Sequence, residues 1–169
     1  MTADSAAKLR LLAAEVRAEQ SRVDRTLAEL TAAADALGRA EIRRALSSMA
    51  RRPFWRPCYS GIEKALMRIA GATSSQPDGG AWHRRLLDDA TLDLPQIRPP
   101  VLSESAARML EPYLAFRHRF RNLYLFDLDV RLVLPLLADA PAAWSAASAD
   151  LTAFAAHIAA LADELDSIG

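Results

Sequence analysis

Hydrophobic residues recur every seven positions along the first quarter of the chain, at Leu9, Val16, Val23, Leu30 and Leu37. Three further apolar residues lie beside this repeat, namely Ala13, Leu27 and Ala34. Since such a repeat stays on one side of an α-helix, it predicts a helix from about Ser5 to Ala36, with Gly38 as its stop. At ~1.5 Å per residue this helix would be roughly 48 Å long. Its narrow apolar stripe suits packing along a helical bundle or across a dimer interface.

The remaining apolar residues predict further helices, over about 40–51, 58–72, 81–91, 103–125, 129–137 and 142–165. Pro53 and Pro57 separate the predicted helix over 40–51 from the one over 58–72, and Pro141 separates the last two helices. Ser103 followed by Glu104 predicts a helix start, while Pro112 predicts either a kink or the start of a new helix. Polar residues predict a loop over 73–80, and the segment LDLPQIRPP, with three prolines, predicts an extended connection over 92–100. The 169 residues therefore predict an all-α fold in a single domain over 1–169.

Charge is balanced overall but unevenly distributed. Residues 39–68 hold eight basic and two acidic side chains, whereas residues 132–169 hold five acidic and no basic ones. The basic excess has two interpretations: a solvated face, or a patch that holds an RNA backbone or an acidic partner. Cys58 is the single cysteine, which excludes an intramolecular disulfide and a cysteine-based zinc site. No apolar run of 18 residues and no secretory leader is present, so we expect a cytoplasmic protein.

One predicted helix concentrates the candidate chemistry. Its residues at spacings of three and four share a face, namely Ala106, Met109, Leu110, Tyr113, Arg117, Phe120 and Tyr124. Arg117 therefore lies in an apolar and aromatic stripe, with His118, Arg121 and Asn122 along its edge. A buried guanidinium is costly unless it is paired or faces a wet cleft. The alternative is an arginine whose stem packs while its head reaches solvent.

The segments YSGIEKALMRIA, WHRRLLDDA, IRPPVLSE and FRHRFRNLYLFDLD, in this order, resemble the HepT-like domain of the HEPN superfamily over roughly residues 55–135. The resemblance implies an up-and-down helical bundle, usually dimeric, and often a metal-independent endoribonuclease. The family motif is an Arg, four to six residues, then a His, commonly followed two positions later by Tyr. Arg117 and Tyr124 match its Arg and Tyr, but Asn122 occupies the His position. An amide cannot exchange a proton near neutral pH, so this departure puts the usual mechanism in doubt.

Residue types and helical spacing suggest roles for the neighbouring side chains in such a reaction. Arg117 and Arg121 would hold the scissile phosphate. His118 would replace the missing acid and base, or is an exposed histidine on the helix surface. Asn122 would orient the substrate or the imidazole. Tyr124 either packs on the stripe or is adenylylated by a minimal nucleotidyltransferase antitoxin.

The leading hypothesis is a homodimeric ribonuclease toxin that cleaves RNA, needs no metal or other cofactor, and pairs with that nucleotidyltransferase. The alternative is a non-catalytic HEPN interaction module that binds a partner protein or RNA without cleavage. The three histidines, His83, His118 and His157, lack carboxylates at ligand spacing in the sequence, so no metal site is predicted. Two further residues receive structural interpretations: Glu63 is expected to pair with a core arginine, and Trp82 to pack rather than to stack on a base.

Overall fold

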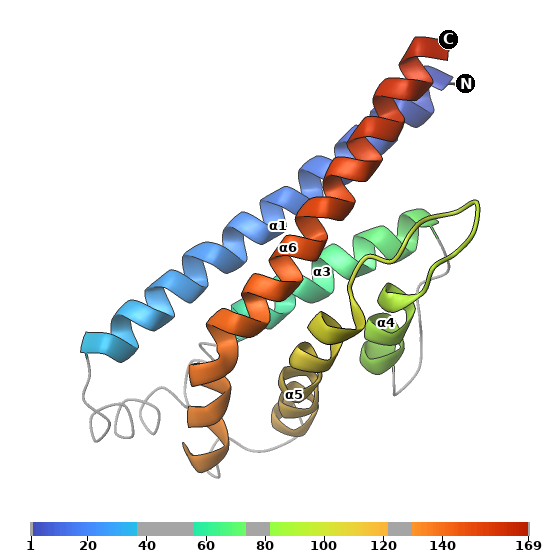
Figure 1. Cartoon of the computed structure of the whole chain (residues 1–169). Coiled ribbons are helices and arrows are strands. Elements are labelled where there is room, and N and C mark those ends of the chain that lie inside the picture. Colours follow the sequence, from blue (N-terminus) through green and yellow to red (C-terminus); the bar gives the residue numbers. More distant parts are fainter. Residues whose placement is uncertain (1, 37–55, 74–81, 122–129, 169) are drawn as a thin grey trace.

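The computed structural model describes residues 2–36, 56–73, 82–121 and 130–168, without the side chains of residues 2, 34, 56–59, 117–121, 130 and 132–133. The described chain is all-α (Figure 1). Its helices are α1 (Thr2–Ala36), α3 (Arg56–Thr73), α4 (Trp82–Thr91), α5 (Glu104–Arg121) and α6 (Val130–Ile168). The all-α prediction is confirmed, and the first helix ends where the sequence predicts. The predicted helix over 40–51 and the loop over 74–80 lie outside the described residues.

The two long helices, α1 and α6, run antiparallel, so both chain termini lie at one end of the bundle (Figure 1). At this end Arg10 of α1 forms ion pairs with two residues of α6, Asp163 at 2.7 Å and Asp166 at 2.6 Å. Farther along, the Gln20 amide donates to Thr152 Oγ1 at 2.9 Å. The long α1–α6 contact therefore combines apolar burial with polar contacts that fix its register.

The seven-residue stripe of α1 lies inside the bundle. Val16, Val23 and Leu30 are buried, and α1 packs against both α3 and α6. At Gly61 of α3 the approach to α1 is so close that a Cβ atom would meet Val23 Cγ2 at 2.4 Å. A glycine at this position therefore sets how closely the two helices pack.

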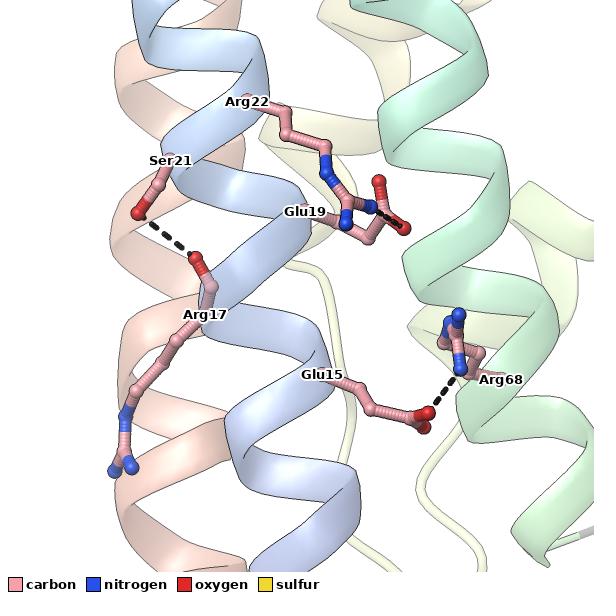
Figure 2. Close-up of polar contacts among 6 residues, drawn as sticks. All are labelled: Glu15, Arg17, Glu19, Ser21, Arg22 and Arg68. Carbon is pink, nitrogen blue, oxygen red and sulfur yellow. Dashed lines mark hydrogen bonds and ion pairs between the residues drawn. The ribbon is translucent and has the colours of Figure 1, made fainter.

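Polar contacts flank the apolar seam between α1 and α3. Figure 2 shows Glu15 of α1 reaching toward Arg68 of α3, with which it forms an ion pair. One turn along, Glu19 is buried and pairs with Arg22 of the same helix at 2.5 Å. A buried carboxylate needs such a partner, because its desolvation is costly.

The predicted helix break at Pro141 is wrong, because α6 continues through both Pro135 and Pro141. A proline inside a helix removes one hydrogen bond and costs about 3 kcal/mol. Around and after Pro141, α6 buries Trp144, Leu151 and Phe154 in the core. Each such side chain contributes about 1.5–3 kcal/mol by burial, so tertiary packing outweighs the cost of the proline.

By length and composition alone, Leu134–Ile168 is apolar enough to cross a membrane, with a mean hydropathy of 1.2. The same segment packs along α1 and α5 and contributes Trp144, Ala147, Leu151, Phe154, Ala155 and Ile158 to the core. A third of this window is buried within the described part of the chain, so packing in the bundle accounts for part of its hydropathy.

The start of α5 is capped as predicted. Ser103 Oγ accepts a hydrogen bond from Ala106 N at 3.2 Å. The Asp150 carboxylate of α6 accepts hydrogen bonds of 2.8 Å from both the backbone nitrogen and the hydroxyl of Ser103. The cap therefore also joins α5 to α6. The helix continues through Pro112 to Arg121.

The connection between α4 and α5 is a tight reversal rather than an extended segment. Leu94 and Arg98 pair as an isolated antiparallel bridge, and Gln96 has a φ of 67°. The buried Arg98 guanidinium donates to the carbonyls of Asp89, Leu92 and Pro99, and its Nε to Thr73 Oγ1, at distances of 2.7–3.2 Å. Burial lowers the pKa of Arg98, against the raising effect of the Asp89 charge. One side chain thus ties the ends of α3 and α4 to the reversal.

Candidate functional site

The helix that carries the predicted site residues, α5, buries a face somewhat different from the predicted stripe. Ala106 and Leu110 are buried as expected, and Tyr113 is partly buried against the core. Met109 belongs to the predicted stripe but is 38% exposed, whereas Leu114 lies outside it and is buried. The neighbours α4 and α6 occupy adjacent sides of α5, which widens and rotates the buried face.

Tyr113 fastens the second half of α5 to α6. Its hydroxyl donates a hydrogen bond of 2.8 Å to the carbonyl oxygen of Leu136. Burial, followed by the charge of Asp139, raises the pKa of Tyr113 to about 12. The phenol therefore stays protonated, and remains a donor, throughout the physiological pH range.

The predicted site residues follow Tyr113. Arg117, His118 and Arg121 are in the last turns of α5, where the structure describes their backbone but not their side chains. Asn122 and Tyr124 lie outside the described residues. The assignment of catalytic, phosphate-binding and modification roles to these five residues stays a prediction.

The helices packed against α5 run in the opposite direction to it. α5 runs antiparallel to α4, because Arg84 of α4 pairs with Glu111 at 3.3 Å while Val101, just before α5, donates to the carbonyl of Ala90. It also runs antiparallel to α6, with Ser103 beside Asp150 and Tyr113 beside Leu136. The N-terminal part of α6 therefore lies beside the C-terminal half of α5, whereas the first turn of α4 lies beside the middle of α5.

This polarity favours positive potential. The first turn of a helix carries a partial positive charge on its free N–H groups, and its last turn a partial negative one. The three arginines at residues 117–121 complement the negative end of α5. Together with the amino end of α6, they can attract anions to this part of the bundle.

A second polar feature is a buried contact between a histidine and a glutamate that joins α3 and α4. His83 Nδ1 contacts Glu63 Oε1, and the two residues are 8% and 5% exposed. The Trp82 ring lies 3.4 Å from that of His83, centroid to centroid, and packs against the core as expected. A described partner of Glu63 is thus a histidine, where the sequence predicted an arginine. The sequence analysis missed this pair, since nothing in the local pattern brings residues 63 and 83 together.

No three His, Cys, Asp or Glu side chains are grouped as metal ligands within the described part of the chain. The predicted site residues themselves offer guanidinium, imidazole, amide and phenol groups, which bind anions or exchange protons.

A family model described as HepT-like protein matches residues 54–158. This chain belongs to the HepT-like family. The match takes in α3, α4, α5 and most of α6, and it includes all the predicted site residues. It confirms the resemblance to HEPN-superfamily proteins, whereas α1 precedes the matched region. No curated protein and no solved structure matches the chain.

Proposed function

We propose that this HepT-like protein is a metal-independent endoribonuclease toxin that acts on cytoplasmic RNA as a homodimer. The observation that supports the proposal best is the polarity of the bundle. The arginine-rich C-terminal half of α5 lies beside the N-terminal part of α6. RNA is a polyanion, and a site built from arginines and helix N-termini suits its phosphates.

In the proposed reaction a base removes the proton of an RNA 2′-hydroxyl. The 2′-oxygen then bonds to the adjacent phosphorus, the bond from phosphorus to the 5′-oxygen breaks, and an acid protonates that leaving oxygen. Arg117 and Arg121 would stabilise the charge on the phosphoryl oxygens through planar, bidentate contacts. His118 would exchange the protons, since its imidazole titrates near neutral pH. Asn122 would orient the substrate or this imidazole through its amide.

Control of the toxin would act on Tyr124. A minimal nucleotidyltransferase antitoxin would join the Tyr124 oxygen to the α-phosphorus of ATP, releasing pyrophosphate while the phenol proton passes to a base of that enzyme. The added AMP carries negative charge and bulk beside Arg117. It would block an RNA phosphate both by occupancy and by charge.

Asn122 favours a second candidate, a non-catalytic interaction module that binds RNA or a partner protein. Without the motif histidine, the arginines still provide a binding surface. The two candidates differ in whether the RNA chain is cut.

The deciding experiment incubates the purified protein with total RNA in the presence of a chelator. We expect fragments with the parent protein and at least a hundredfold slower cutting by Arg117→Ala and by His118→Ala, since positioned charge and general acid–base groups each contribute about 10²–10⁴-fold. Arg108→Ala is the matched control. This arginine is on the same helix, exposed and paired with Glu104 at 3.1 Å, and we expect it to leave cutting unchanged.

Uncut RNA with unmodified parent protein would refute the ribonuclease. Retained binding of a single-stranded RNA, weakened by Arg117→Ala but not by Arg108→Ala, would then support the interaction module.

The modification is tested by intact-mass measurement after incubation with a nucleotidyltransferase of the antitoxin type and ATP. We expect the mass of AMP to be added to the parent and not to Tyr124→Phe. Tyr113→Phe is the control, because the Tyr113 hydroxyl is bonded to Leu136 and resists ionisation. Addition of AMP to Tyr124→Phe but not to Tyr113→Phe would place the modification on Tyr113 instead of Tyr124.

A further inference from the structure

The outward face of α6 carries small, uncharged side chains. Its exposed residues are Ser145, Ala149, Thr152, Ala153 and Ala156. A helix face that meets only water normally carries charged and long polar residues, whereas small side chains let another helix approach closely. A third of the apolar window within Leu134–Ile168 is buried in the described part of the chain, so much of the apolar surface of α6 is not covered by the core.

These side chains line an open groove of about 700 Å³ between α6 and α1. The groove follows α6 from Pro141 to Ala156, and Asp24 and Leu27 of α1 line its other side. At 1.5 Å per residue this stretch of α6 is roughly 22 Å long, or about four turns. The groove is therefore long enough to receive a helix lengthwise.

Two opposite charges of α1 lie beside this groove, and neither has an ionic partner among the described residues. The Asp24 carboxylate accepts a hydrogen bond of 2.6 Å from Trp144 Nε1. The exposed Arg17 guanidinium donates a long hydrogen bond of 3.5 Å to the carbonyl of Ala155. Figure 2 shows this arginine on the side of α1 away from Arg68. Both charges can therefore be paired from outside the bundle.

The spacing of these charges makes the side of α1 complementary to itself. Arg17 and Asp24 are seven residues apart, so they lie within about 20° of each other around the helix and ~10 Å apart along it. Ala14, Ser21 and Ala28 are exposed on the same side and are small. When two such helices lie antiparallel, each acidic residue can face the basic residue of the other helix.

We propose that the groove and this side of α1 form the interface between two copies of this chain, related by a two-fold axis. The axis reverses the direction of one copy, so that Asp24 faces Arg17 of the partner subunit, and Arg17 faces Asp24 of the partner subunit. The α1 helix of each copy lies in the groove of the other, where the small side chains of α6 leave room for it. The inference rests on the homodimer of the proposed function and names its interface, but it does not depend on the ribonuclease chemistry.

A membrane is the other environment that could cover the apolar face of α6. The charges of Arg17 and Asp24 lie beside the groove, and hydroxyl groups such as that of Thr152 line it. Charged side chains are costly to place in hydrocarbon, whereas a second copy supplies the opposite charge to each of them. These groups therefore favour a second copy over a lipid surface.

Sedimentation velocity of the full-length protein over a range of concentrations measures the dissociation constant of the dimer. We expect the parent to dimerise, and Ala153→Arg to weaken the dimer about tenfold or more, because a long charged side chain fills the groove. Ala115→Arg is the matched control, since Ala115 is exposed on α5, which does not line the groove. Circular dichroism checks that both variants fold. A dimer lost in Ala115→Arg but kept in Ala153→Arg would place the interface on α5 and overturn the inference.

An exchange of charges tests the pairing itself. Arg17→Glu brings two acidic groups together across the interface, and Asp24→Lys two basic groups, so each should weaken the dimer about tenfold or more. The double variant restores opposite charges and should recover most of the affinity. Each single change also removes a contact within the monomer, so damage to the fold alone would make the double variant the weakest of the three. That result, or single variants that dimerise as tightly as the parent, would contradict the pairing.

The remaining outcomes separate this inference from the proposed function. A dimer that none of the groove variants weakens would overturn the inference and leave the homodimer in place. A parent that is monomeric at every concentration would overturn both, whereas RNA cutting is judged independently with Arg117→Ala. Flotation of the parent with vesicles of phosphatidylcholine and phosphatidylglycerol, abolished by Ala153→Arg, would assign the face to a membrane instead.

Discussion

The Tyr113 hydroxyl of α5 donates a 2.8 Å hydrogen bond to the backbone carbonyl of Leu136 in α6. This contact lies one turn before Arg117. It joins the helix that carries the predicted phosphate-binding residues to the start of the long C-terminal helix. The position of the candidate site relative to α6 therefore depends on a phenol that is not part of the family motif.

Tyr113→Phe removes this hydrogen bond and leaves the ring in place. A hydrogen bond of this kind contributes about 1 kcal/mol, which corresponds to roughly 2–4 °C in the unfolding midpoint of a chain of this size. We expect a midpoint lower by that amount in thermal unfolding followed by circular dichroism. A midpoint equal to that of the parent would show that water replaces the hydroxyl without cost.

The same phenol predicts a pH dependence in alkaline solution. Because the pKa of Tyr113 is raised to about 12 from the ordinary value of 10, the folded protein holds this proton more tightly than the unfolded chain. The stability contributed by this group is complete below pH 10 and is lost as the pH rises through 12. Spectrophotometric titration should show one tyrosine ionising later than the others, and Tyr113→Phe should abolish this late phase. A late phase that persists in the variant would contradict the assignment.

Gly61→Ala tests the close approach of α1 and α3. The new Cβ would meet Val23 Cγ2 at 2.4 Å, and Val23 is a short, buried side chain that cannot turn away freely. Overpacking of this kind costs about 1–3 kcal/mol, and we expect the loss in urea-induced unfolding. Gly71→Ala is the control in the same helix, where the residue is exposed and alanine should stabilise by about 0.5–1 kcal/mol. If the clash is the cause, adding Val23→Ala should recover part of the loss in Gly61→Ala.

Arg98→Met tests the tie between α3, α4 and the reversal at Leu94–Arg98. The substitution keeps an aliphatic stem and leaves three carbonyls and the Thr73 hydroxyl without their donor. Hydrogen bonds donated by a charged group contribute about 1.5–3 kcal/mol each, so the protein should lose several kcal/mol in unfolding. Arg10→Met is the contrast, since Arg10 binds Asp163 and Asp166 in solvent, and we expect little change. Equal losses of unfolding free energy in the two variants would show that the buried contacts of Arg98 do not account for its contribution to stability.

The helices themselves could largely be predicted because their signals are local. The seven-residue repeat places α1, and Ser103 with Glu104 places the start of α5. Pro57 falls in the first turn of α3, where its missing N–H costs nothing. The prediction failed at Pro141, where the local signal for a break competes with core packing that the sequence does not display.

The order of residue types by itself determined the helical class of this protein and the HepT-like motif around Arg117, because periodicity, capping and spacing act over a few residues. Only the tertiary structure decided the long-range pairings. It brings Glu63 to His83, Gly61 to Val23, and Tyr113 to Leu136. These pairings depend on the direction and depth at which helices pack. Burial then increases the free-energy cost of losing a polar contact, because no water is present to replace the lost partner.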